Sequence, residues 1–394
     1  MKRTLQIGAI AGAAALVLAG CSSSPSPDSS PSGVASAAAS VSGGPRVAVG
    51  YEGGVLVLGG DDLTVIGDFA SEDFVRLNSA GDGRHVLVTT SEGFQLLDVR
   101  RPELTDLVVP AATAGHVVVH GGKTVLYDDA TSDTTIFDTA DLAARGDALP
   151  DAEVVPGVEA HHGVSVELED GTLLTTLGGK TGRTGIRVLG ADRTEVAANA
   201  ECPGVHGEGT AQGERVVFGC ENGVLVYDGG GITKLASPDA YGRIGNAFVS
   251  EDSPLVVMDY KDDPDAEGYL LRNIALVDTA AKSLRKVALP AGIEYTFRGI
   301  ARGPAAEAVL IGTDGSLHWI DPATGGITRS LPVIDSWEGP SAWQEPHPAV
   351  KVAADIAYVT DPARRELVAV SLTTAEIVQR VKLPQVPNEI AVVS

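Results

Sequence analysis

After residue 46 this chain repeats a pattern of short strands with a period of about 45 to 50 residues. Apolar runs of roughly four to six residues alternate with Gly, Asp and Pro turns, and no segment keeps a 3.6-residue period. The third run of a unit closes on an aspartate, as in Val125-Leu126-Tyr127-Asp128 and Ile274-Ala275-Leu276-Val277-Asp278. Four such strands per unit predict the blades of a β-propeller.

The repeat is complete in seven units, which span residues 74–108, 112–150, 158–198, 202–237, 242–290, 295–333 and 346–384. Two segments, Arg46 to Leu58 and Asn388 to Val393, are left over and can pair or supply strands to the terminal blades. We therefore expect an all-β fold, a single propeller over residues 46–394 with seven blades of four antiparallel strands. Eight blades are the alternative count. A pair of β-sandwiches is disfavoured because the repeat spans the whole region.

The first 45 residues have a different composition and predict export. Lys2 and Arg3 precede an apolar run that ends in Leu18-Ala19-Gly20-Cys21, the pattern of a secretory signal peptide over residues 1–20. The ending resembles the lipobox of bacterial lipoproteins, which implies cleavage before Cys21 and acylation of its thiol. Residues 22–45 are rich in Ser, Pro, Ala and Gly, so residues 21–45 are expected to form an acylated, flexible tether. The predicted location is extracytoplasmic, with the chain anchored to the bacterial cell membrane through Cys21.

The net charge of −23 argues against nucleic acid as a partner, because so acidic a chain repels phosphate backbones. No Gly-x-Ser-x-Gly nucleophile motif is present, and we expect no enzymatic activity. We expect a monomer.

Besides the N-terminal cysteine the chain has two cysteines, and the segment between them predicts a hairpin. A turn at Ala211 to Gly213 places Cys202 opposite Cys220. Facing residues of antiparallel strands lie about 4.5 to 5.5 Å apart, a distance that suits a disulfide. An extracytoplasmic location permits such a bond, which would hold the strand that carries His206.

Four of the eight histidines lie on or beside the first strands of their predicted units: His116, His162, His206 and His347. First strands line the central channel of a propeller, so side chains from different blades meet at one mouth. Neutral imidazole suits zinc, with nitrogen–metal distances of about 2.0 to 2.1 Å. The pattern therefore predicts a zinc site at the channel mouth. Glu208, two residues past His206, is a further ligand candidate or a carboxylate that orients an imidazole.

Other readings of these histidines remain open. A histidine in an all-β protein is more often a surface residue or a hydrogen-bonded core residue, and only the shared position of the four favours a metal site. His161 and His120 lie near enough to substitute for one of them, whereas His85 and His318 fall on second and third strands and are interpreted as structural.

Three short stretches resemble the AztD family of bacterial zinc metallochaperones: Ala160-His161-His162-Gly163, Cys202-Pro203-Gly204-Val205-His206-Gly207-Glu208 with Cys220, and Glu345-Pro346-His347-Pro348. Members of that family are exported β-propellers that hand zinc to the solute-binding protein of a zinc ABC importer. The resemblance covers most of residues 46–394 and implies zinc as the bound metal and such a solute-binding protein as the partner. The family's flexible His-rich segment has no counterpart, because residues 22–45 contain no histidine. The expected lipid anchor also departs from the soluble family members.

Three hypotheses follow for the function. The first is a lipid-anchored propeller that holds zinc and passes it to a partner. The second is a metal-free propeller lipoprotein that binds a ligand or a protein, with Arg76, Arg243 and Arg298 at the channel favouring an anion. The third is a hydrolase or lyase with His162 or His206 as base, for which the sequence offers no nucleophile.

Overall fold

The computed structural model describes residues 43–145 and 148–394. The predicted signal peptide, Cys21 and the tether up to residue 42 lie outside these residues. Within the described residues, no helix is long and apolar enough to span a membrane.

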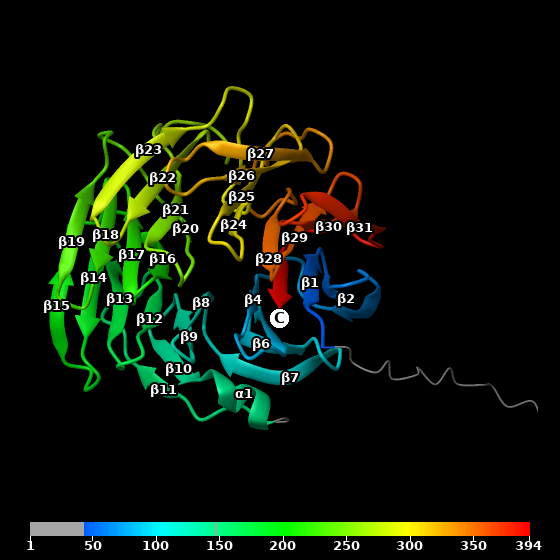
Figure 1. Ribbon diagram of the computed structural model, residues 1–394. Coiled ribbons are helices and arrows are strands. Elements are labelled where there is room, and N and C mark those ends of the chain that lie inside the picture. Colours follow the sequence, from blue (N-terminus) through cyan, green and yellow to red (C-terminus); the bar gives the residue numbers. More distant parts are fainter. Residues whose placement is uncertain (1–42, 146–147) are drawn as a thin grey trace, which may run out of the picture. The chain divides into compact units, whose positions relative to one another are not determined.

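The described residues form eight four-stranded antiparallel sheets, the blades of a propeller, around a central channel (Figure 1). The first three blades along the chain after the N-terminal strands are β4 (Leu77–Ser79), β5 (His85–Thr90), β6 (Gly93–Asp98) and β7 (Glu103–Pro110); β8 (Ala114–His120), β9 (Lys123–Asp128), β10 (Thr134–Asp138) and β11 (Glu153–Val155); and β12 (Ser165–Glu167), β13 (Leu173–Gly179), β14 (Gly182–Leu189) and β15 (Glu195–Asn199).

The next four blades are β16 (His206–Ala211), β17 (Arg215–Cys220), β18 (Gly223–Tyr227) and β19 (Ile232–Ala236); β20 (Ala247–Phe248), β21 (Leu255–Tyr260), β22 (Asn273–Asp278) and β23 (Ser283–Ala288); β24 (Ile300–Arg302), β25 (Ala308–Ile311), β26 (Ser316–Ile320) and β27 (Ile327–Pro332); and β28 (Val350–Ala353), β29 (Ile356–Asp361), β30 (Glu366–Ser371) and β31 (Glu376–Lys382). All seven predicted units are therefore blades.

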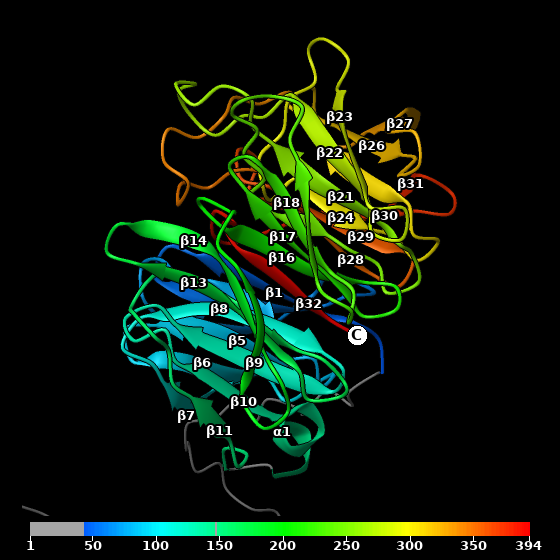
Figure 2. The same cartoon turned by 90° about the vertical axis from the view of Figure 1, so that its left-hand side faces the viewer.

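The predicted count of seven blades is wrong, because the two leftover segments build an eighth together with residues 65–70, which the prediction assigned to no strand. This blade combines β1 (Arg46–Tyr51), β2 (Gly54–Gly59) and β3 (Val65–Ala70) with the C-terminal strand β32 (Ile390–Val393). Strand β32 pairs with β1 in antiparallel register, from Arg46 opposite Val393 to Val49 opposite Ile390 (Figure 2). Pairing of these two segments closes the ring, with β1 inside the sheet and β32 as a largely buried strand at the end of the strand order.

The burial of each strand follows its position in the blade. The second and third strands are apolar runs, and those such as β5 and β30 are buried almost throughout because neighbouring blades cover both of their faces. Outermost strands such as β15 and β31 alternate between exposed and half-buried residues. Hydrophobic clusters fill the space between adjacent blades; in one, Val166 and Val188 pack with Val216 and Phe218 of the next blade. One short helix, α1 (Thr139–Arg145), follows β10 in the described residues.

The first strand of each of the seven predicted units is the innermost strand of its sheet and faces the channel (Figure 1). Any polar side chain at the start of such a strand is therefore brought toward the mouth of the channel. This is the feature of the fold that builds the candidate site.

Candidate metal centre at the channel mouth

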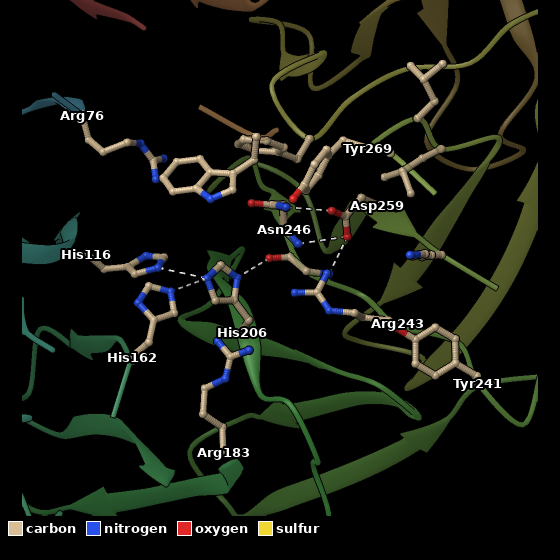
Figure 3. Close-up of a pocket in the computed structure, with 17 residues that line it drawn as sticks. Arg76, His116, His162, Arg183, His206, Tyr241, Arg243, Asn246, Asp259 and Tyr269 are labelled. Carbon is tan, nitrogen blue, oxygen red and sulfur yellow. Dashed lines mark hydrogen bonds between the residues drawn. The ribbon is translucent and has the colours of Figure 1, made fainter. Parts of the chain in front are cut away.

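Three of the four predicted histidines meet at the channel mouth. His116 is on β8, His162 lies three residues before β12 and His206 begins β16, so consecutive blades supply them. The Nε2 atom of His206 lies 3.1 Å from that of His116 and 3.0 Å from that of His162 (Figure 3). One ring nitrogen from each of the three lies within 4.8 Å of the others, an arrangement that could hold a metal ion.

The opposite ring nitrogens have partners that orient the imidazoles. Nδ1 of His162 is 2.6 Å from a carboxylate oxygen of Asp129, and Nδ1 of His206 faces the backbone carbonyl of Gly245. Both partners accept, so in the neutral rings the proton sits on Nδ1 and the Nε2 lone pair points into the site; this tautomer is inferred from the hydrogen bonds. Glu208 lies 3.8 Å from Nδ1 of His116 on the corresponding side.

This set of tautomers directs lone pairs at one another across about 3 Å. Such contacts are unfavourable unless a cation lies between the nitrogens. In a tetrahedral zinc site with bonds of about 2.0 to 2.1 Å, two ligand nitrogens are roughly 3.3 Å apart. The observed separations need only a small expansion to reach this value, and three protein ligands leave a fourth position open.

The surroundings keep two of the imidazoles neutral. Burial, together with the neighbouring histidines and with Arg76 and Arg183, holds the pKa of His116 well below its usual value. Burial is also the main cause that lowers the pKa of His206 to about 3. Burial of the neighbouring carboxyl raises the pKa of Glu208 to about 7. Neutral imidazole is the form that binds a metal, so no proton must leave these two rings at neutral pH.

A glycine permits the close approach that orients His206. Gly207 has a φ of +68°, and a β-bulge lies between His206 and Glu208. A Cβ atom at Gly207 would lie 2.6 Å from the backbone carbon of Gly245, whose carbonyl accepts from His206. A side chain at this position would push the two segments apart.

The predicted disulfide between Cys202 and Cys220 is present, with the Cα atoms 4.9 Å apart. The hairpin turn at residues 212–214 also agrees with the prediction. The predicted register is wrong at one end, because His206 rather than Cys202 is the first residue to pair with β17, opposite Gly219. Cys202 instead lies before the strand, followed by Pro203, which has no amide proton to donate to a ladder. The bond thus ties the approach to β16 to the end of β17.

The remaining predicted ligand residues do not converge with the three histidines. His347 precedes β28 and is buried against Phe297, with Nδ1 bound to the carbonyl of Glu345. The reason is its blade, since β28 is not adjacent to β8, β12 or β16 in the ring (Figure 1). Glu208 stands behind His116, the position of an orienting carboxylate.

The two substitute histidines are held elsewhere. His161 bonds to Tyr127, Ser132 and Thr176 beside its own blade. His120 is four residues beyond His116 on β8, and both of its ring nitrogens lie 3.0 Å from carboxylates, those of Glu214 and Glu251. The structural reading of His85 and His318 fits their buried hydrogen bonds.

The three histidines open into a cavity of about 490 Å³ with a positive wall. Arg76, Arg183 and Arg243 line it together with Asp259 (Figure 3). Lys261 and aromatic residues such as Tyr241 and Trp343 complete the lining. The predicted channel residue Arg298 is instead paired with Glu389, at 2.6 Å.

Sequence reasoning missed Asp129, Gly245 and Arg183. Asp129 lies in the turn after β9, Gly245 in the segment before β20 and Arg183 at the start of β14, and no local pattern marks them. The Asp128-Asp129 pair at a blade turn was the one visible signal.

Comparison with known proteins supports the same family resemblance. The chain is 26% identical over 307 residues to the zinc chaperone AztD of Citrobacter koseri, a match that covers 75% of this chain and 69% of that protein. No family model matches. The resemblance to AztD that the sequence motifs indicate is therefore confirmed.

Solved structures confirm the propeller fold. Apo AztD from Citrobacter koseri matches with a TM-score of 0.74 and 22% identity, over 89% of this chain and 97% of that one. A second AztD structure from that organism gives a TM-score of 0.71 over the same shares. The dihydro-heme d1 dehydrogenase NirN, in complex with DHE, matches at 0.61 and 14% identity, over 89% of this chain and 76% of that one.

Proposed function

We propose that this protein is an extracytoplasmic zinc metallochaperone. It holds zinc with His116, His162 and His206 and passes the ion to the solute-binding protein of a zinc ABC importer. The observation that carries the proposal is the convergence of three Nε2 atoms whose rings are oriented from behind. The similarity to a zinc chaperone supports the same metal.

The open fourth position and the exposed edge of the site suit a carrier. Half of the His162 side chain is accessible, at 48%. A structural zinc site is closed by four protein ligands, whereas a site with three leaves a position at which another molecule can take hold of the ion. An acceptor that supplies a ligand there can begin to remove zinc before the histidines release it.

Metal analysis tests the binding step. The purified protein, stripped with a chelator and reloaded, is expected to hold one zinc ion per chain. His116→Ala should remove this zinc, while His120→Ala, a change on the same strand outside the cluster, should retain it. Equal loss in both variants, with both folded by circular dichroism, would show that the cluster is not the site.

Stopped-flow transfer tests the delivery step. Zinc-loaded protein is mixed with increasing concentrations of the apo solute-binding protein from the same organism. Direct delivery requires a transfer rate that rises with acceptor concentration and exceeds the rate of zinc loss to a chelator. A transfer rate that equals the rate of zinc dissociation at every acceptor concentration would show that the protein binds zinc without delivering it directly.

The anchor is a separate part of the proposal. Acylation of Cys21 after signal cleavage would place the propeller at the outer face of the cell membrane. A Cys21→Ser change is expected to move the protein from the membrane fraction to the soluble fraction without changing its zinc stoichiometry.

A second candidate function is supported by the positive wall of the cavity. Arg76, Arg183, Arg243 and Lys261 in one cavity would suit an anionic ligand in a metal-free propeller. A reloaded protein that holds no zinc but binds small anions would favour this alternative.

A further inference from the structure

The positive wall of the cavity stands out against the charge of the protein. The whole chain carries a net charge of −23, yet four basic side chains line the cavity that contains the three histidines. Three carboxyl groups near the histidines already have partners: Asp129 bonds to His162, Glu208 lies 3.8 Å from Nδ1 of His116, and Asp259 accepts from the backbone and side chain of Asn246. The cavity is therefore short of negative charge.

Within the described residues, two of the four basic side chains make no direct contact with an acceptor, although carboxylates lie near enough to act on them electrostatically: Glu221 and Asp129 on Arg183, and Asp259 on Arg243. Arg76 pairs with Glu389 at 3.3 Å, and Lys261 donates to the carbonyl of Ala266. Across residues 43–145 and 148–394, the guanidinium groups of Arg183 and Arg243 show no hydrogen bond and no ion pair. Unpaired guanidinium groups in a concave site are ready-made receptors for carboxylate.

Both unpaired groups lie beside the histidine cluster. Figure 3 shows the side chains of Arg183 and Arg243 flanking the ring of His206. The electrostatic effect of each reaches this ring. Zinc bound to three neutral imidazoles would add two positive charges to a region that already holds these two. An anion that touches both the metal and the guanidinium groups would remove this repulsion.

We propose that Arg183 and Arg243 hold a small di- or tricarboxylate whose carboxylate oxygen fills the open fourth position on zinc. This inference rests on the proposed function and specifies the form of the cargo: zinc enters and leaves together with a carboxylate anion. Carboxylate oxygen is an ordinary zinc ligand, at about 2.0 to 2.2 Å. The second carboxylate binds the guanidinium groups in the two-pronged geometry that arginine favours. A cavity of about 490 Å³ lies in the size range of small-molecule sites.

The coupling between the two ligands gives a direct test. Equilibrium dialysis of radiolabelled citrate is performed with the apo and the zinc-loaded protein, after zinc stoichiometry has been measured in anion-poor buffer. Citrate is expected to bind the zinc-loaded form at least tenfold more tightly. By thermodynamic reciprocity, citrate should raise zinc affinity by the same factor when free zinc is fixed with an indicator.

Matched variants assign the effect to the two arginines. In Arg183→Gln/Arg243→Gln, citrate binding to the zinc-loaded protein should fall at least tenfold, while zinc binding without citrate stays within threefold or tightens. Arg101→Gln, a change at an exposed arginine outside the cavity, should behave as the parent. If the double variant is unstable, the single change Arg183→Gln provides a second readout. Its loss of citrate affinity should lie between those of the parent and the double variant.

The possible outcomes separate this inference from the proposed function. Failure of the parent protein to bind zinc overturns the proposed function and this inference with it. Two results overturn only the carboxylate inference, provided that the parent protein binds zinc. The first is an equal citrate affinity of the apo and zinc-loaded forms. The second is a double variant in which citrate and zinc still strengthen each other's binding as in the parent. If inorganic phosphate raises zinc affinity as much as citrate does, the ligand is not specifically a carboxylate and the inference is refuted. If a hexaglutamate peptide raises zinc affinity and citrate does not, the small-molecule ligand is refuted and the carboxylate belongs to a protein partner.

Discussion

The pH dependence of zinc affinity is the most discriminating prediction. Protons compete with zinc for an imidazole only at pH values near or below the pKa of the free ring. The pKa values of His116 and His206 are both lowered, mainly by burial, the latter to about 3. Because these rings are already neutral when the metal is absent, acidification from pH 7 to pH 5.5 should take little affinity from them.

The magnitude follows from proton competition. A ligand imidazole with the ordinary pKa of about 6.5 would cost about 8-fold in affinity between pH 7 and pH 5.5, and three such ligands would cost about 600-fold. With His116 and His206 outside the competition, at most one imidazole of the triad can exchange a proton for zinc, which limits the loss to about 30-fold, the maximum for one proton over 1.5 pH units. Glu208 adds its own dependence, because a carboxyl group with a pKa of about 7 loses its proton when zinc approaches. The Glu208→Gln variant removes this contribution.

The assay is competition against a chromophoric chelator of known pH-dependent affinity, applied to the Glu208→Gln protein at pH 5.5, 6.0, 6.5 and 7.0. Titration calorimetry in buffers of different ionisation enthalpy should show that the triad releases no more than one proton per zinc. A fall of several hundredfold, or the release of two or more protons, would refute the argument that burial holds these imidazoles neutral.

Three other predictions concern the groups behind the ligands. Asp129→Asn should weaken zinc binding about 10- to 100-fold, because it removes the charge that orients His162. The control Asp192→Asn, at an exposed turn, should leave zinc affinity unchanged. Equal zinc affinity in the two variants would contradict the orienting role. Gly207→Ala should lower both the free energy of unfolding and zinc affinity, whereas Gly53→Ala, which has a φ of +89° and open space around it, should cost only about 1 kcal/mol of stability in urea unfolding. In a chain of residues 43–394, thiol titration without reductant should find no free thiol. Reduction of the disulfide should lower the free energy of unfolding by about 3 kcal/mol. Identical midpoints of urea unfolding with and without reductant would contradict this.

Much of the architecture could be read from local pattern. A propeller blade is made of neighbouring segments of the chain, so turns and apolar runs locate its strands without knowledge of distant contacts. This is why the seven predicted units match seven blades and why the Cys202–Cys220 bond was predictable from a single hairpin. The eighth blade was not, because it pairs Arg46 with Val393, the two ends of the propeller region.

The site divides in the same way. Sequence alone determined that His116, His162 and His206 lie at inner strands, since that follows from their place in the repeat. Only the tertiary structure decided which histidines meet: three on consecutive blades converge, and His347 does not. The tertiary structure also decided which groups bond to the Nδ1 atoms of these histidines, and that Arg183 and Arg243 have no ion-pair partner in the described part of the chain. Those contacts join residues of different blades, and the sequence carries no local signal for a distance across the ring.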